Sequence, residues 1–362
     1  MKHEQSTSKV QQLVKTCVRD NIPYAVQFEL TTDCNLKCRH CFMVKNNYVE
    51  LSTDEIKGII DQLVEIGTFY LAFTGGEIFT RDDLFDILGY AKEKGFFMTL
   101  MTNGTLIMPK HIEELKRLKP VKFEISLYGV TPETHDNITC TDGSFKQTVF
   151  AIDSLIKEGF EVIIKMPLMN LNFQESEEME KQCAKRGVHL RMNPGMAPSR
   201  GGSTHTQQYD LSDNDLRTFL AGHKLDLSYL HEKDPAQRFK CKAGNAACSI
   251  TSAGLVYPCV IMPIQVGNLR QQSFKYIWNI DPCKELRRLR DLRSHDLDEC
   301  SRCESKPFCV RCPGVTYLET NDIVRASPSA CRYAAIRKTL ENNQQINLIQ
   351  TGSEQVLSLT AL

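Results

Sequence analysis

The chain has 362 residues, 41% of them hydrophobic, which suits a globular protein of one large domain or two modest ones. Lysine plus arginine and aspartate plus glutamate both number 44, so no overall charge favours nucleic acid or an acidic membrane. Residues 1–20 lack the apolar core of a signal peptide, and no run approaches the roughly 18 apolar residues of a membrane span. We therefore expect a cytoplasmic protein with no nucleic-acid or membrane partner.

Short β-rich runs alternate with helical patterns from about residue 24 to 192, and this alternation predicts a parallel sheet with crossover helices. Six such units form either an open doubly wound sheet or a partial barrel, and periodicity does not separate the two. Both architectures place their chemistry at the carboxyl ends of the strands. The predicted strands cover residues 24–31, 69–76, 96–104, 121–129, 161–169 and 188–194.

The helices between these strands carry recognisable start signals. In residues 51–67, Ser52 and Glu55 have the spacing of a capping box, and in residues 80–95 Asp83 is an expected helix opener. The apolar faces are expected to hold Ile56, Ile59, Ile60, Leu63 and Val64 in the first helix, and Phe145, Val149, Ile152 and Ile156 in a helix over residues 144–159.

Fifteen cysteines are many for a cytoplasmic protein, so a disulfide scaffold is the first alternative to weigh. The length of the chain, the missing export signal and the odd count speak against it. Clustered cysteines without export indicate metal binding instead. The clustered cysteines are Cys34, Cys38 and Cys41, then Cys241, Cys248 and Cys259, and then Cys300, Cys303, Cys309, Cys312 and Cys331.

The first cysteine group, in "CNLKCRHC", supplies three thiols within eight residues, one fewer than a closed tetrahedral site needs. A zinc site completed by His40 or by a distant cysteine is the alternative, but His40 adjoins Cys41 and lacks the usual spacing of a zinc finger. A 4Fe-4S cluster held by the three cysteines is the better interpretation, because its fourth iron stays free to bind a small molecule.

At this point the sequence resembles the radical S-adenosylmethionine superfamily. The signature C-x-x-x-C-x-x-C is followed by the aromatic Phe42, and a second motif appears after the second strand as "FTGGEIF". The resemblance implies a partial (β/α)6 TIM-like barrel and S-adenosylmethionine bound at the open iron. Cleavage of the cofactor would give a 5'-deoxyadenosyl radical that takes hydrogen from an unactivated C–H bond. The cofactor-facing residues that it implies are Gly75, Gly76, Glu77, Asn103, Ser126, Arg191 and Phe42.

Several of these positions have an ordinary structural alternative. Gly75, Gly76 and Glu77 could form a strand-to-helix turn, and Asn103 and Ser126 could cap strand ends. Arg191 could form a salt bridge at the edge of the core instead of meeting the cofactor.

The eight later cysteines could hold two structural zinc ions, but their order resembles the SPASM extension of radical S-adenosylmethionine enzymes, which binds two auxiliary 4Fe-4S clusters. Both clusters would be fully ligated and suited to electron transfer, and the first could bind a substrate thiol only if Cys248 or Cys312 were not a ligand. Carried over by position, the first set is Cys241, Cys248, Cys259 and Cys312, and the second is Cys300, Cys303, Cys309 and Cys331.

The resemblance and the composition together predict five segments along the chain. A polar stretch rich in glycine, serine and glutamine, residues 198–210, breaks the strand and helix alternation and is typical of a flexible link. The predicted segments are an extension (1–22), the radical S-adenosylmethionine core (23–197), a bridging region (198–235), a small irregular SPASM domain (236–335) and a tail (336–362).

Enzymes with this extension mostly modify ribosomally made peptides or proteins, so the first hypothesis is a maturase that crosslinks a precursor peptide. Val260 follows the V-Y-P-C motif where the sulfatase-maturing branch has a catalytic carboxylate, which disfavours formylglycine formation. The second hypothesis is a tetrapyrrole-modifying enzyme of alternative haem or haem d1 synthesis, and the third is a zinc scaffold without catalysis.

The expected partners follow from the first hypothesis. They are the peptide substrate and a low-potential electron donor such as flavodoxin or ferredoxin. A separate peptide-recognition protein is also expected, since only about 33 residues precede the cluster motif, too few for a winged-helix recognition domain.

Two further side chains have both a functional and an ordinary interpretation. Cys140, where similar enzymes often have glycine, is a candidate donor of hydrogen to a substrate radical, and an ordinary loop cysteine is the alternative. His205, in the polar 198–210 stretch, is expected to be a solvated histidine.

Overall fold

The computed structural model describes residues 9–43, 48–223 and 241–342. All six strands predicted from the sequence are present, and helices follow or precede each of them in the first part of the chain. The elements of this part are α1 (Lys9–Arg19), β1 (Ala25–Thr31), α2 (Thr53–Glu65), β2 (Tyr70–Gly75), η1 (Ile78–Thr80), α3 (Leu84–Glu93), β3 (Phe97–Thr102), α4 (Pro109–Leu118), β4 (Lys122–Ser126), α5 (Pro132–Thr139), α6 (Ser144–Lys157), β5 (Val162–Leu168), η2 (Phe173–Glu175), α7 (Ser176–Arg186) and β6 (His189–Pro194).

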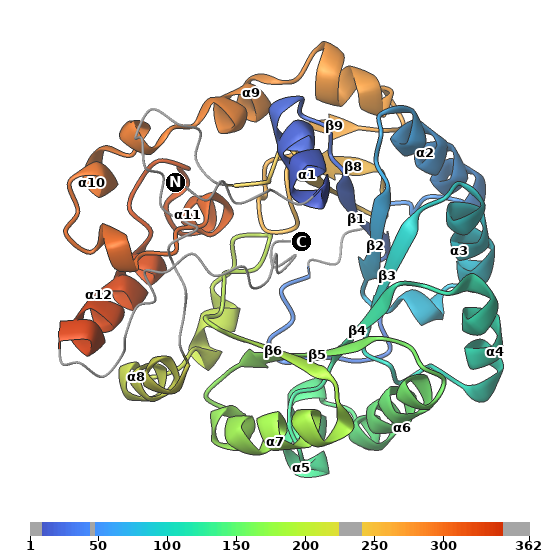
Figure 1. The fold of residues 1–362 in the computed structure, drawn as a ribbon, viewed down its shortest axis with the longest axis horizontal. Helices are drawn as coiled ribbons and strands as arrows, with labels where there is room; N and C mark the ends of the chain where they lie inside the picture. The colour runs from blue at the N-terminus through green and yellow to red at the C-terminus, as the bar shows by residue number, and fades with distance from the viewer. Residues whose placement is uncertain (1–8, 44–47, 224–240, 343–362) are drawn as a thin grey trace, which may run out of the picture.

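Strands β1 to β6 lie in the sheet in chain order, each parallel to the one before it. A doubly wound sheet reverses its strand order at a switch point, so this order excludes that architecture. Helices α2, α3, α4, α6 and α7 line the outer side of the curved sheet (Figure 1). Within the described residues, β6 is an edge strand and the sheet does not close, so the fold is a partial TIM-like barrel.

Strand β1 shows how the sheet separates its two faces. Val26, Phe28 and Leu30 are fully buried in the main hydrophobic core, whereas the residues between them are polar. Because side chains alternate along a strand, Gln27 and Glu29 point to the opposite face, the interior of the barrel. The interior is therefore polar and the core lies between the sheet and its helices.

The local signals in the helices are partly confirmed. Ser52 and Glu55 form the predicted capping box of α2, but Val64 is 42% exposed and does not belong to its buried face. In α6 the buried stripe is rotated from the predicted one, since Ser144, Thr148, Ala151, Ile152 and Leu155 are buried. The other members of the predicted face, Phe145, Val149 and Ile156, are only partly buried against the core.

The cysteine-rich part of the chain begins inside the same sheet. Strand β7 pairs with β1 in parallel, and β8 and β9 follow in antiparallel order, so the sheet has nine strands. The remaining elements are η3 (His205–Tyr209), α8 (Asp213–Gly222), β7 (Ala247–Ile250), β8 (Leu255–Tyr257), β9 (Gly267–Asn268), η5 (Tyr276–Ile280), α9 (Lys284–Asp291), η6 (Ser294–Asp296), α10 (Asp298–Ser301), η7 (Lys306–Phe308), α11 (Pro313–Thr320) and α12 (Pro328–Asn342).

One of the segment boundaries expected from the sequence falls inside a helix of the structure. Helix α12 continues through the boundary expected after residue 335, and Ile336 and Leu340 on it are buried in the main core. The rest of the expected tail, from residue 343, lies outside the described residues. No helix in the described ranges combines the length and apolar character needed to cross a membrane.

Candidate functional site

The first three clustered cysteines lie in one loop directly after β1. The pKa of Cys38 is raised to about 12, mainly by burial and then by the nearby thiols of Cys41 and Cys34, so the three side chains lie near one another. The carboxyl end of α5 supports this loop, since the amides of Lys37 and Arg39 donate to the carbonyls of Thr139 and Ile138 at 3.1 and 2.9 Å. His40 does not complete the set, because its ring packs edge-on against Tyr128.

The glycines of the G-G-E motif lie against the same loop. The amide of Gly76 donates to the carbonyl of Thr31 at 2.9 Å. A Cβ atom on Gly75, whose φ is +150°, would lie 2.3 Å from the Thr31 oxygen, and one on Gly76 would lie 2.2 Å from the Asp33 oxygen. Both glycines are thus required by the close approach of two backbone segments, next to Cys34.

Glu77 is buried and holds neighbouring parts of the site together. Its Oε1 accepts from the Thr102 hydroxyl at 2.7 Å and the Phe79 amide at 3.1 Å, and its Oε2 accepts from the Asn103 amide at 2.7 Å. Burial raises the pKa of Glu77, while these bonds act in the opposite direction. A carboxylate accepts about four hydrogen bonds, so roughly one position remains for an ammonium group.

Asn103 orients the cluster loop through its side chain. Its Nδ2 donates to the Asn35 side chain at 3.0 Å and lies 3.9 Å from the Cys34 sulfur. Ser126, at the end of β4, is half-buried and bonds to the Tyr128 hydroxyl. Tyr128, which the sequence did not single out, is near enough to all three cysteines for their charges to raise its pKa, after burial as the main cause.

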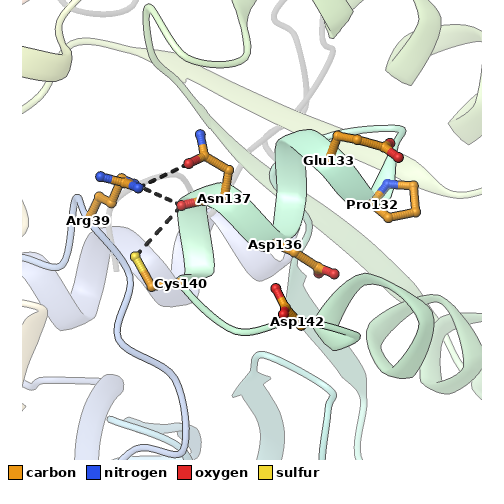
Figure 2. A pocket seen from close by; sticks show the side chains of 7 residues that line it. All are labelled: Arg39, Pro132, Glu133, Asp136, Asn137, Cys140 and Asp142. Carbon is orange, nitrogen blue, oxygen red and sulfur yellow. Dashed lines mark hydrogen bonds between the residues drawn. The ribbon is translucent and has the colours of Figure 1, made fainter.

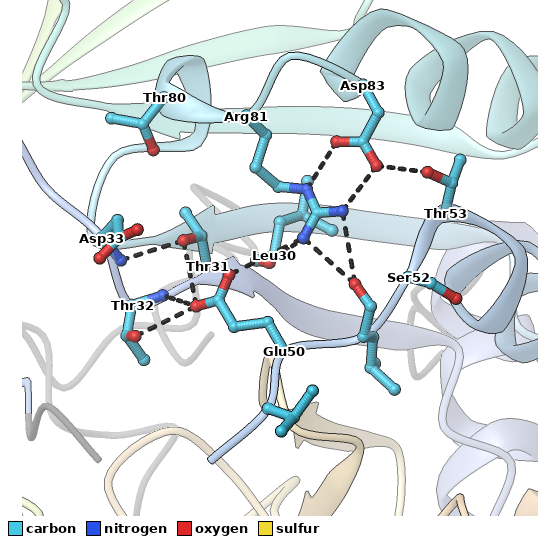
Figure 3. A network of polar contacts seen from close by, with 12 residues as sticks. Leu30, Thr31, Thr32, Asp33, Glu50, Ser52, Thr53, Thr80, Arg81 and Asp83 are labelled. Atoms are coloured by element: carbon cyan, nitrogen blue, oxygen red, sulfur yellow. Dashed lines mark hydrogen bonds and ion pairs between the residues drawn. The ribbon is translucent and has the colours of Figure 1, made fainter. Parts of the chain in front are cut away.

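A polar network around Arg81 fixes the entry to the cluster loop (Figure 3). The Arg81 guanidinium donates to both carboxylate oxygens of Asp83, at 2.8 and 2.6 Å, and to the carbonyl of Leu30 at 3.0 Å. Glu50 accepts from the Thr32 amide at 2.6 Å. Asp83 occupies the N-cap position of α3, as predicted, but its side chain pairs with Arg81 and makes no capping bond.

The 198–210 stretch contacts the cluster loop and is not a free link. The amide of Arg200 donates to the Phe42 carbonyl at 3.3 Å, and Nε2 of His205 bonds to the Cys41 carbonyl at 3.1 Å. His205 is exposed, as expected, but has this specific partner. The Arg200 guanidinium reaches into the barrel, where it pairs with buried Glu29 and lies 5.6 Å from the ring centre of Tyr257.

Arg191 belongs to a buried charge cluster on the inner face of β4, β5 and β6. It lies 3.2 Å from Glu124, and Lys165 and Lys122 lie 3.3 and 3.6 Å from the same carboxylate. The salt bridge expected as the alternative for Arg191 is therefore present, and a cofactor contact stays a prediction. Three cations around one carboxylate leave this part of the barrel positive.

Cys140 ends α5 beside the cluster loop, close enough to Cys38 for its charge to affect the Cys38 thiol. Its Sγ lies 3.7 Å from the Asn137 carbonyl, to which Arg39 also donates (Figure 2). These residues line an open pocket of about 680 Å³. The backbone of Cys140 is left-handed, with φ of 53°, which explains why glycine suits this position.

We expect Cys140→Gly to raise the free energy of unfolding by up to about 1 kcal/mol, because it removes a side chain from a left-handed backbone position. The yield of 5'-deoxyadenosine is expected to stay the same. Urea unfolding and mass spectrometry of the reaction measure the two quantities. Cys140→Ala is the control, since it keeps the backbone strain and should bring no gain. A less stable glycine variant would contradict this account.

The cysteines of the second predicted set lie near one another, and their role as ligands stays a prediction. The pKa of Cys309 is raised to about 11, mainly by burial and then by the charges of Cys331 and Cys300. Burial also raises the pKa of Cys331, with Cys300 and Cys303 adding to the effect. These four thiols suit one closed cluster.

The other predicted set is only partly brought together. The pKa of Cys241 is raised to about 12, mainly by burial and then by the thiols of Cys259 and Cys312. Cys248 takes no part in this coupling. It is fully buried in the main core, and after burial the only other influence on its pKa is Arg290. Three of the four residues therefore suit a cluster and Cys248 does not.

The spacing of these cysteines bears on the zinc alternatives. Ligands of one zinc ion lie about 2.0–2.3 Å from it, which places them close to one another. Throughout the described ranges, no three histidine, cysteine, aspartate or glutamate side chains converge in that way.

Comparison with known proteins agrees with this site. Residues 28–183 match the family described as the radical SAM superfamily, and residues 241–304 match the SPASM family, described as an iron-sulfur cluster-binding domain. The chain is 30% identical over 342 residues to the AdoMet-dependent heme synthase of Methanosarcina barkeri, covering 85% of this chain and 96% of that protein. It is 30% identical over 302 residues to the mycofactocin maturase MftC of Mycobacterium tuberculosis, covering 78% and 77%.

The fold is also found in a solved structure, Streptococcus suis SuiB bound to its precursor peptide SuiA, with a TM-score of 0.67, 16% identity, and coverage of 89% of this chain and 80% of that one. The chain belongs to the radical S-adenosylmethionine superfamily. Within it, the chain is an enzyme of the SPASM type, which excludes the zinc scaffold without catalysis. Membership implies S-adenosylmethionine and 4Fe-4S clusters as cofactors.

Proposed function

We propose that this enzyme modifies a ribosomally made peptide or protein, installing a crosslink or a related change. The observation that carries the proposal is the partial barrel, because among the described residues no strand pairs with β6 on its far side and the sheet does not close. An extended polymer can enter such an opening without threading a chain end through it. SuiB, which shares the fold, was solved with a precursor peptide.

In this proposal the chain's own residues prepare the cofactor site. Cys34, Cys38 and Cys41 hold the first cluster, and the remaining acceptor position of Glu77 receives the cofactor's amino group. When bound, the clusters and S-adenosylmethionine supply the 5'-deoxyadenosyl radical and carry electrons. Glu77 also ties Thr102 and Asn103 to the glycine turn, so the same carboxylate that binds the cofactor keeps the loop around it rigid.

Three clusters are proposed in all, and the auxiliary ones would be held by the cysteines after residue 240. Tyr257 on β8 and Arg200 connect the two parts, because Arg200 pairs with Glu29 in the barrel and lies close enough to Cys259 to affect its pKa. This arrangement supports electron transfer between a substrate radical in the barrel and the auxiliary clusters. A crosslink removes two hydrogen atoms from the peptide, one taken by the radical and one leaving as a proton and an electron. When bound, the auxiliary clusters would supply an acceptor for the excess electron, and the carrier would be of the flavodoxin or ferredoxin type.

A tetrapyrrole substrate is the second candidate, and two observations favour it. The heme synthase from M. barkeri is matched over 96% of its length, more than the 77% of MftC. In addition, Lys165 and Arg191 give the inner face of the barrel more positive than negative charge, which suits the carboxylates of a tetrapyrrole.

We expect the variant with Cys34, Cys38 and Cys41 all changed to alanine to form no 5'-deoxyadenosine, because no ligands remain for the first cluster. The measurement is anaerobic reconstitution, reduction with dithionite and mass spectrometry. A control with Cys140 and Cys283 changed to alanine should keep both the iron and the product. Unaltered production in the triple variant would refute the assignment of the cluster.

The two substrate classes are separated by adding each to the reconstituted wild-type enzyme. Peptides encoded beside the gene are expected to accelerate 5'-deoxyadenosine formation and to lose hydrogen atoms. Carboxylated porphyrins are expected to do neither. Stimulation by the porphyrin alone would replace the peptide proposal with the tetrapyrrole one.

A further inference from the structure

Cys248 packs in the main hydrophobic core, apart from the small cluster that Cys241 and Cys259 contact. Strand β7 pairs with β1 so that Cys248 stands beside Val26 and Ile250 beside Phe28. Side chains at paired positions point to the same face, and Val26 and Phe28 belong to the core between sheet and helices. Cys248 is consequently directed outward, into that core, and is fully buried there.

Cys259 comes after strand β8, whose Tyr257 points to the opposite face of the sheet from Cys248. On β8, Tyr257 pairs with Ser249, which alternates with Cys248, and Tyr257 lies beside Arg200 and thus beside the barrel interior. Arg200 also acts on Cys259, two residues further along. Cys241 and Cys259 both pack against a separate small cluster around Met262 and Leu289. Cys248 therefore packs in the main core, whereas Cys241 and Cys259 contact a different apolar cluster.

No other cysteine takes the place of Cys248, since every cysteine of the chain lies in the described residues. Cys17 packs with Tyr24 and Ala246, and Cys183 lies in the main core with α7. Cys140 adjoins the first cluster loop. Cys283 is partly buried against the main core.

We propose that the first auxiliary cluster is held by three cysteines, Cys241, Cys259 and Cys312, that Cys248 is a core residue, and that one iron of this cluster carries an exchangeable ligand. Soft donors suit such an iron, so the class of ligand expected to bind most tightly is a thiolate. Binding of a thiol would release its proton and displace the resident ligand, with no change of oxidation state. The inference concerns one cluster and does not depend on which substrate the enzyme takes.

The first test compares iron and acid-labile sulfide per chain in reconstituted variants. Cys248→Ala is expected to keep the wild-type amounts, as is its matched control Cys183→Ala, another cysteine buried in the same core. Cys259→Ala is expected to lose up to about four irons, one cluster. Loss of a cluster in Cys248→Ala with retention in Cys183→Ala would overturn the proposal.

The second test leaves Cys248 in place and so does not depend on the folding of its variants. In the full chain with Cys34, Cys38 and Cys41 changed to alanine, the first auxiliary cluster is the one with an open iron. Adding imidazole, and in a parallel sample 2-mercaptoethanol, is expected to shift the electron paramagnetic resonance spectrum of the reduced protein. A spectrum that neither probe changes would mean four protein ligands and would overturn the proposal.

Discussion

Gly76→Ala is expected to cost at least about 3 kcal/mol of folding free energy and to empty the first cluster. The added Cβ would lie 2.2 Å from the Asp33 oxygen, 2.6 Å from its carbonyl carbon and 2.8 Å from the Thr32 oxygen. All three are backbone atoms of the segment that leads into Cys34, so relief of the clash moves the cluster loop. Urea unfolding and iron content of the reconstituted protein measure the two effects.

Gly89→Ala is the matched control for this variant. Gly89 lies within α3, and a Cβ there meets nothing within 4 Å, so alanine should stabilise the helix by up to about 1 kcal/mol. Its iron content should equal that of the wild type. A Gly76→Ala protein with full iron and unchanged stability would show that the glycine turn does not support the cluster loop.

Glu124→Gln is expected to lower the free energy of unfolding by up to about 3 kcal/mol, because it leaves buried Lys122 and half-buried Lys165 and Arg191 without a counter-charge. Denaturant unfolding at neutral pH measures the change. Glu158→Gln is the control, since Glu158 forms an exposed pair with Lys116 and its loss should have little effect. Equal stabilities of the two variants would contradict the importance of the buried cluster.

The lowered pKa of Glu124 predicts that the stability of the folded protein depends on pH. Burial would raise the pKa of Glu124, but the charges of Lys165, Arg191 and Lys122 outweigh it and hold the pKa below its ordinary value. A carboxyl group with a lowered folded-state pKa contributes stability above its unfolded pKa, and this is lost as the pH falls through the folded one. The wild type should therefore lose more stability than Glu124→Gln on acidification below about pH 4.5. Parallel acid titrations that decline identically would argue against this.

The strands and most helices were predictable because their signals are local. The capping box at Ser52 and the apolar runs of the six strands depend only on neighbouring residues. Val64 shows the limit, since the apolar period of α2 extends one residue beyond the side that the sheet covers. The choice of a barrel over a doubly wound sheet depended on strand order, which periodicity does not contain.

The site was predictable where its residues are close in sequence. Cys34, Cys38 and Cys41 could be grouped from spacing alone, but Arg200 could not, because its partner Glu29 lies 171 residues away. Arg81 was likewise missed, as its sequence neighbourhood indicates only the start of a helix. The proposal that Cys248 is a core residue rests on the alternation of Cys248 and Ile250 along a buried strand, which cysteine spacing does not reveal.

Strand β1 gains its neighbour on one side at residues 70–75 and on the other only at residues 247–250. During synthesis, one edge of β1 stays unpaired until most of the chain has been made. This strand leads directly to the first cluster loop. Long-range pairings of this kind slow folding and leave a sheet edge open to wrong partners. The cell therefore has reason to insert iron late, after the cysteine-rich segment has completed the sheet around the loop that receives it.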